Sequence, residues 1–142
     1  MTRNPLRNLV AVGLGVLAGL PLAAQSPGGS PAEGNPSIQQ ALDRNPGRRV
    51  FVPAGDYIIN QAVRITTDHA GLWGPGRIIQ ANPAEAIVEV KDAAGVQLQD
   101  LTLTRADGAQ ETHRPGLSIA RCPDVVVSGV RVIDNWSDGN GI

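Results

Sequence analysis

The chain has 142 residues, with 12 basic and 13 acidic side chains and a formal net charge of −1. This length suits one domain, and a charge so close to zero argues against nucleic acid as a partner. The single cysteine, Cys122, excludes an internal disulfide. Free cysteines are commonly buried, so we expect Cys122 to fill a core position rather than to act as a reactive thiol.

Residues 1–25 have the layout of a secretory signal peptide. Arg3 and Arg7 give a positive start, residues 9–20 are a run of Leu, Val, Ala and Gly, and small residues follow near residue 25. The apolar run is shorter than the ~20 residues of a membrane span, and an uncleaved anchor is the weaker alternative. The pattern predicts a secreted or periplasmic protein with no membrane contact beyond the signal peptide.

Residues 26–34 are rich in Ser, Pro and Gly and predict a linker. A helix is then expected to start with Asn35 as its N-cap and Pro36 at its first position, and to end by the Asn-Pro-Gly sequence at 45–47. Its apolar residues share one face: Ile38, Ala41 and Leu42. Such a short helix needs a surface to pack on, and we expect it to cap the end of the next structure.

The strongest pattern is a repeat of three short strands, each reading apolar, variable, apolar. The copy that begins at Val88 superimposes without a gap on the copy that begins at Leu117, and a weaker copy begins at Val63. Three strands per repeat predict the coils of a parallel β-helix. The two matching copies are residues 88–90, 96–98 and 101–103, and residues 117–119, 125–127 and 130–132.

The same alternation predicts which side chains point inward, so we expect Val127→Asp to unfold the domain by burying a charge in a stacked core. The inward set is Val88, Val90, Val96, Leu98, Leu101, Leu103, Leu117, Ile119, Val125, Val127, Val130 and Val132. The outward set is Gln97, Thr102, Ser118 and Arg131.

The β-helix domain is expected to cover residues 35–142, in about four coils. Ile142 falls on the first strand of a further coil. This position predicts that residues 35–142 are the N-terminal part of a longer β-helix, and a partner that covers the open end is the alternative. We therefore expect the chain alone to be inactive and prone to associate through its last coil.

Three segments together resemble the start of the pectate-lyase-like superfamily. They are Ser-Ile-Gln-Gln-Ala-Leu at 37–42, Val-Phe-Val-Pro-Ala-Gly-Asp-Tyr at 50–57 and Gly-Leu-Trp-Gly-Pro-Gly at 71–76. The resemblance implies an all-β fold, a right-handed single-stranded parallel β-helix with an N-terminal capping helix. It also implies a polysaccharide-active protein, a lyase or glycoside hydrolase on glycans that contain uronic acids. The alternative is a non-catalytic β-helix that binds glycan or serves as a surface scaffold.

In that superfamily the active cleft usually lies along one sheet, bordered by the loops that enter its strands. Carried over to this chain, the sheet would contain residues 63–65, 88–90 and 117–119 and Ile142. Its substrate-binding candidates are Arg64, Glu89 and Ser118 on the strands and Arg114 and Trp136 on the loops. Asp134 and Asp138 are the catalytic candidates.

The chemistry of these residues suits acidic sugars. Arginine pairs with the carboxylate of a uronic acid, and paired carboxylates serve acid–base catalysis or hold Ca²⁺. Each residue also has a simpler interpretation, because Asp favours turns and Arg64 and Glu89 could pair only with each other across neighbouring coils.

Other motifs are weak or absent. The sequence Trp-Ser-Asp-Gly at 136–139 only faintly matches the Asn-Thr-Asp motif of polygalacturonase-like enzymes, and the other motifs of those enzymes are absent from residues 1–142. No zinc-ligand spacing or phosphate loop is found. No cofactor is evident beyond the Ca²⁺ that a pectate-lyase-type enzyme would use.

Overall fold

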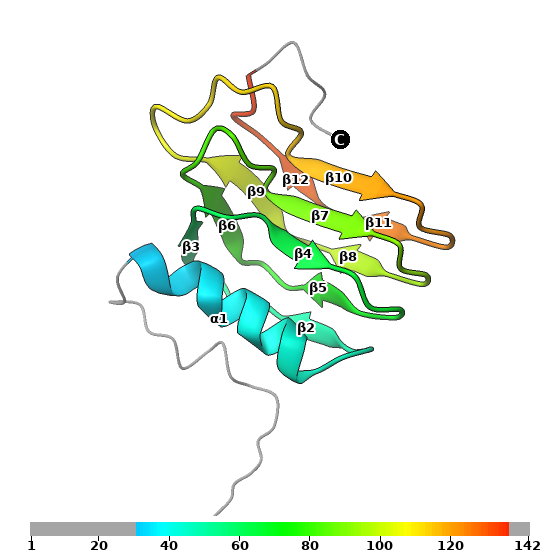
Figure 1. The fold of residues 1–142 in the computed structure, drawn as a ribbon. Helices are drawn as coiled ribbons and strands as arrows, with labels where there is room; N and C mark the ends of the chain where they lie inside the picture. Colours follow the sequence, from blue (N-terminus) through cyan, green and yellow to red (C-terminus); the bar gives the residue numbers. More distant parts are fainter. Residues whose placement is uncertain (1–30, 137–142) are drawn as a thin grey trace, which may run out of the picture.

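The computed structural model describes residues 31–136, which form a parallel β-helix with one helix at its N-terminal end (Figure 1). The strands are short because each spans one side of a coil before the chain turns a corner. The elements are α1 (Pro31–Arg44), β2 (Arg49–Phe51), β3 (Asp56–Ile59), β4 (Val63–Ile65), β5 (Gly71–Trp73), β6 (Arg77–Gln80), β7 (Val88–Lys91), β8 (Gln97–Gln99), β9 (Thr102–Arg105), β10 (Leu117–Ala120), β11 (Val126–Ser128) and β12 (Arg131–Val132).

Three parallel sheets form the sides of the solenoid, with strand orders β10-β7-β4, β11-β8-β5-β2 and β12-β9-β6-β3. Each strand pairs with the equivalent strand of the next coil, as the sequence repeat predicts. The described residues thus contain three complete coils, β4–β6, β7–β9 and β10–β12, and a partial coil of β2 and β3. The sequence predicted about four coils, and the described residues form one partial and three complete coils.

The pairing register confirms the repeat that was read from the sequence. The strands of the last two coils pair at one constant offset, the one that sets Leu117 opposite Val88, and the weaker copy pairs with Val63 opposite Val88. Inward residues of successive coils consequently lie one above another. The predicted inward residues that are buried are Val88, Val90, Val96, Leu98, Leu101, Leu103 and Leu117.

The last described coil differs from the prediction. Ile119 and Val127 were expected inside but are 38% and 39% exposed, and Val125, Val130 and Val132 are only partly buried against the core. The reason is that, within residues 31–136, β10, β11 and β12 each have a neighbouring strand on one side only. The full burial of Val127 on which the Val127→Asp expectation rested was therefore wrong, since that side chain is 39% exposed.

The start of α1 also differs from the prediction. The helix begins at Pro31 instead of Pro36, and so includes part of the expected linker. Proline at the first helical position suits Pro31 as well as Pro36. Ser30 and Glu33 also have the Ser-x-x-Glu spacing that is typical of a helix start. The helix ends at Arg44, as the Asn-Pro-Gly sequence indicated.

Helix α1 covers the N-terminal end of the solenoid, which confirms the predicted cap. Ile38 and Leu42 are buried in the core cluster. Gln39 uses its side-chain amide where a neighbouring strand would use its backbone: Nε2 donates to the carbonyl of Arg64 at 3.1 Å, and Oε1 accepts from the Arg64 N–H at 2.9 Å. This amide satisfies part of the open edge of β4, which would otherwise be free to pair with another chain.

Cys122 lies between β10 and β11, where it is half-buried against the core and its thiol donates to the carbonyl of Ala120. This arrangement agrees with a structural position, although less buried than expected. The predicted signal peptide at residues 1–25, Asp138 and Ile142 lie outside the described residues. In the part of the chain that the structure describes, no helix is both long and apolar enough to cross a membrane.

Candidate functional site

The outward side of the β4-β7-β10 sheet holds the predicted row of polar residues. Arg64 pairs in register with Glu89, and Glu89 with Ser118. The three residues therefore lie side by side across three coils, as the resemblance implied. Because most of their neighbours in sequence are buried, the alternation of the strands fixes these side chains on the outer surface.

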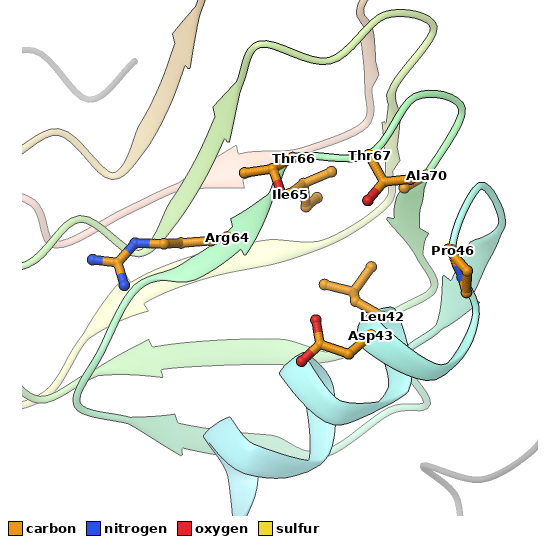
Figure 2. A pocket seen from close by; sticks show the side chains of 8 residues that line it. All are labelled: Leu42, Asp43, Pro46, Arg64, Ile65, Thr66, Thr67 and Ala70. Atoms are coloured by element: carbon orange, nitrogen blue, oxygen red, sulfur yellow. The ribbon is translucent and has the colours of Figure 1, made fainter.

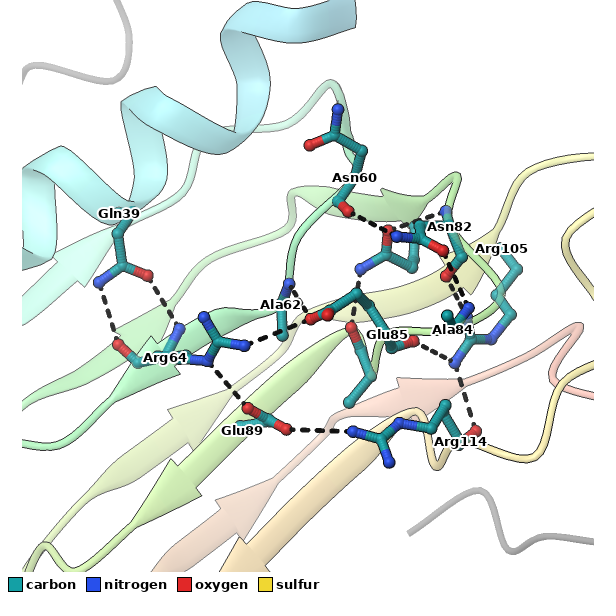
Figure 3. A network of polar contacts seen from close by, with 12 residues as sticks. Gln39, Asn60, Ala62, Arg64, Asn82, Ala84, Glu85, Glu89, Arg105 and Arg114 are labelled. Carbon is teal, nitrogen blue, oxygen red and sulfur yellow. Dashed lines mark hydrogen bonds and ion pairs between the residues drawn. The ribbon is translucent and has the colours of Figure 1, made fainter.

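Ion pairs link this row to two loop residues (Figure 3). Arg64 donates from Nε to Glu89 at 3.1 Å and from Nη2 to Glu85 at 3.4 Å, and Nη2 of Arg114 lies 4.0 Å from the other carboxylate oxygen of Glu89. The two arginine side chains are about half exposed, at 54% and 50%. We call Arg64, Glu85, Glu89, Arg114 and Ser118 the arginine face.

The pairing of Arg64 with Glu89 across neighbouring coils, which was the simpler interpretation, is thus present in the structure. It leaves the arginine face with two accessible guanidinium groups, one on each side of Glu89. Exposed ion pairs contribute little net stability, roughly 0–1 kcal/mol. The pairing therefore does not prevent either arginine from exchanging its partner for an anionic ligand.

Arg114 belongs to the loop between β9 and β10, and hydrogen bonds hold its backbone at both polar atoms. Its N–H donates to Oγ1 of Thr112 at 2.9 Å. Its carbonyl accepts from Nη2 of Arg105 and from Nδ2 of Asn135, both at 3.3 Å. These bonds fix the Arg114 backbone at a place from which its guanidinium reaches Glu89.

Arg105 is the residue that organises this region, and sequence reasoning missed it. It is 3% exposed, and its guanidinium donates to Oδ1 of Asn135 and to backbone carbonyls of the surrounding loops. In the described part of the chain it makes no ion pair, and burial lowers the pKa of Arg105 from its ordinary value. The carbonyl acceptors are those of Asn82, Glu85, Arg114 and Pro115.

A signal for Arg105 was present in the sequence. The inward positions of its strand alternate as Leu101, Leu103 and Arg105, and the preceding coil ends in the same way with Gln80, which is opposite Arg105 and fully buried. Gln80 bonds the carbonyl of Ala86 at 2.7 Å. Two polar residues at the last inward position of successive coils indicate a buried polar layer under the loops.

The loop candidates Asp134 and Trp136 make their contacts with residues outside the arginine face. The carboxylate of Asp134 accepts from the Thr104 hydroxyl at 3.2 Å, and Asp134 has φ 56°, which is typical of Asp at a turn. Trp136 is 58% exposed and forms a parallel bridge with Glu111. Neither Asp134 nor Trp136 has a hydrogen bond or ion pair to the arginine face among the described residues.

The described residues contain no group of three or more His, Cys, Asp or Glu side chains placed to hold a metal ion. Glu85 and Glu89 are the carboxylates of the arginine face, and both are paired with Arg64. Ca²⁺ takes six to eight oxygen ligands. The Ca²⁺ that the resemblance implies therefore does not fit the arginine face as it is arranged.

A hollow of about 170 Å³ lies at the end of the arginine face, between the C-terminal part of α1 and β4 (Figure 2). Figure 2 shows the guanidinium of Arg64 directed away from this hollow, while Asp43 and two threonines border it. The hollow is open and partly polar, so it adjoins the face without enclosing a ligand. It is lined by Leu42, Asp43, Pro46, Arg64, Ile65, Thr66, Thr67 and Ala70.

The chain matches no family model, no curated protein and no solved structure. The resemblance to the pectate-lyase-like superfamily therefore stays a prediction. The class that the structure defines is that of parallel β-helix proteins.

Proposed function

We propose that this protein is a secreted or periplasmic β-helix protein that acts on uronic-acid-containing polysaccharide along the arginine face. The observation that carries the proposal is the row of Arg64, Glu89 and Ser118 across three coils, with Arg114 beside it. Strands of successive coils lie ~4.8 Å apart, so the row extends in the direction along which a glycan chain could lie.

Each residue of the row has a role in this proposal. Arg64 and Arg114 pair with carboxylates of successive uronic acid units, because guanidinium groups bind carboxylates with two parallel hydrogen bonds. Glu89 lies between the two arginines and accepts hydrogen bonds from sugar hydroxyls, and Ser118 provides a further hydroxyl partner.

The catalytic part of the proposal, lyase or hydrolase, is carried by the resemblance and by Asp134 and Asp138. A non-catalytic glycan-binding protein is the second candidate, and one observation favours it. Glu85 and Glu89, the two carboxylates on the arginine face, both have arginine partners, whereas glycosidases need two carboxyl groups at a fixed separation across the scissile bond.

Calorimetric titration of the protein with oligogalacturonate tests the binding proposal. We expect saturable binding that weakens about tenfold in Arg64→Gln and in Arg114→Gln, since each loses one charge-assisted pair. Arg77→Gln is the matched control, because Arg77 forms an exposed ion pair with Asp56 on a different sheet. Binding that is equal in all three variants would contradict the proposal.

Incubation of the protein with polygalacturonate, with and without Ca²⁺, separates the two candidates. An unsaturated product indicates a lyase, saturated products with new reducing ends indicate a hydrolase, and tight binding without product indicates the non-catalytic protein. Because Asp138 belongs to the catalytic candidates, Asp138→Asn should abolish any turnover.

A further inference from the structure

The outer side of the β2-β5-β8 sheet carries an aromatic pair that the proposed function does not use. Phe51 and Trp73 are register partners on β2 and β5, their ring centroids lie 4.5 Å apart, and Trp73 is 40% exposed. The aromatic residues of the whole chain are one Phe, one Tyr and two Trp. Half of them thus lie together on one outer surface.

Arg49 lies over this pair. Its guanidinium carbon is 6.0 Å from the centroid of the Trp73 ring, and its Nη1 donates to Oε1 of Gln99 at 3.2 Å. Within residues 31–136, Arg49 has no carboxylate partner. Four other arginines on the surface of the solenoid do have one: Arg64, Arg77, Arg114 and Arg121. Arg48 and Arg131 are exposed and, within the same residues, have no carboxylate partner either, so the position over an indole is what distinguishes Arg49.

The register places two amide side chains beside the aromatic pair. Gln99 is opposite Trp73 on the next coil, and Gln97 is opposite Gly71. Gly71 is buried, and the backbone of Gln97 approaches it so closely that a Cβ there would lie 2.0 Å from the Gln97 carbonyl oxygen. We call Arg49, Phe51, Trp73, Gln97 and Gln99 the Trp73 face.

We propose that the Trp73 face is a second binding surface, for a sugar ring that carries a carboxylate. The carboxylate pairs with Arg49, the ring packs against the indole of Trp73, and the amides of Gln97 and Gln99 bond the hydroxyl groups. Trp and Arg supply most of the binding energy in many interfaces, because they combine a large contact area with directed polar groups. Packing between coils alone would explain the aromatic pair, but not a guanidinium that is held over the indole without a carboxylate.

This inference does not depend on the arginine face, since the two faces lie on different sheets of the solenoid. It extends the proposed function by giving an acidic glycan two separate places to bind. A polymer bound at both faces would be held more tightly than at either, provided that it is long enough to reach around the solenoid.

Fluorescence of Trp73 tests the proposal directly. The chain has two tryptophans, so Trp136→Phe leaves Trp73 as the only indole reporter. In that background we expect a saturable fluorescence change with a short oligogalacturonate and a much weaker one with a neutral gluco-oligosaccharide of the same length. Arg49→Gln should weaken the response about tenfold, with the circular dichroism spectrum unchanged because Arg49 is exposed.

Variants of the other face distinguish the two proposals. Arg64→Gln and Arg114→Gln should leave the Trp73 response intact even if they abolish binding at the arginine face. If either variant removes the Trp73 response, the signal comes from the arginine face and the proposal is overturned. It is equally overturned if the neutral oligosaccharide gives the same response, or if no response is seen with either ligand.

Discussion

Replacing Arg105 with Met gives the most informative test of how the loops of this solenoid are held. The substitution removes a buried cation that bonds four backbone carbonyls and Asn135, and it keeps a flexible side chain of similar reach. The acceptors lie in the segments between β6 and β7, between β9 and β10, and after β12. The variant therefore removes the common partner of three loops without changing any residue of the arginine face.

The size of the effect follows from two opposing contributions. A buried acceptor left without a donor costs about 1–3 kcal/mol, so four carbonyls set an upper limit of roughly 4–12 kcal/mol. Much of this is recovered, because these acceptors belong to surface loops that can rehydrate, and because burying a guanidinium that has no counter-ion already destabilises the native state. We expect a net loss of about 2–4 kcal/mol, a large fraction of the ~5–15 kcal/mol that stabilises a typical domain.

Urea unfolding at pH 7 measures this loss, and hydrogen exchange reports on the loop itself. We expect faster exchange at the Arg114 amide, whose N–H is bonded to Thr112 in the native loop. Arg105→Lys keeps the charge but not the planar fork of donors, so it should recover only part of the stability. Arg77→Met is the matched control, and loss of its exposed ion pair should cost below ~1 kcal/mol. If Arg105→Met is as stable as the control and the amide exchanges at the native rate, the role assigned to Arg105 is wrong.

Three further predictions concern the coils. Leu98→Ala should lower the free energy of unfolding in urea by about 2–5 kcal/mol because Leu98 is buried. Val127→Ala, at the next position of the same stack, should lower it by less than ~1 kcal/mol because Val127 is 39% exposed. Equal losses would contradict the observed end of the core. Gly71→Ala should fail to fold or unfold at much lower temperature, because its Cβ would lie 2.0 Å from the Gln97 carbonyl oxygen; a native melting temperature would refute this. The hydrogen bond from Arg121 holds the pKa of Asp92 below its ordinary value of 3.8, so in Arg121→Gln an NMR titration should show that pKa rising. A lowered native pKa means that the stability from this pair is present above pH ~4 and is lost as the pH falls through the native pKa.

The repeat was readable from the sequence because a β-solenoid turns sequence offset directly into spatial neighbourhood. Once one residue of a coil is matched to the next, every other residue of that coil follows at the same offset. That is why Leu117 and Val88, and with them the row of Glu89 and Ser118, were placed correctly. The period of two then fixed which of these residues point outward.

Other features could not be read in this way, because they depend on contacts that no offset gives. The burial of Val127 depends on whether a strand lies on its far side, and its own sequence does not indicate that. The inward positions of Gln80 and Arg105 can be read from the repeat, but the backbone carbonyls that surround them belong to loops whose paths the repeat does not give.

The Trp73 face was missed for a related reason, because the early coils differ in length. Val50 lies opposite Leu72, and Leu72 lies opposite Leu98. The second of these separations is longer than the first, so the early coils lack the constant spacing that marked the later ones. Without that spacing, the sequence did not indicate that Phe51 and Trp73 are neighbours.

The contrast among the arginines indicates where a ligand can bind. Arg105 is fully used by neutral acceptors inside the protein and is inaccessible, so it shapes the surface but cannot contact a ligand. Arg64 and Arg114 are half exposed and share one carboxylate, Glu89. Because an exposed pair is worth only ~0–1 kcal/mol, a ligand carboxylate can replace it at little cost.

Arg49 needs no such exchange, because no carboxylate among the described residues is paired with it. Its guanidinium is already oriented by the Gln99 amide and the Trp73 ring, so little side-chain entropy remains to be lost on binding. An anion at Arg49 therefore gains a charge-assisted pair without breaking one, whereas an anion at Arg64 must compete with Glu85 and Glu89. For the same ligand, removal of a nearby protein carboxylate should therefore change binding at the Trp73 face less than binding at the arginine face.

Glu89→Gln provides the comparison. It should strengthen oligogalacturonate binding at the arginine face and leave the Trp73 fluorescence titration unchanged. The opposite result would show that the two surfaces do not bind by the electrostatics described.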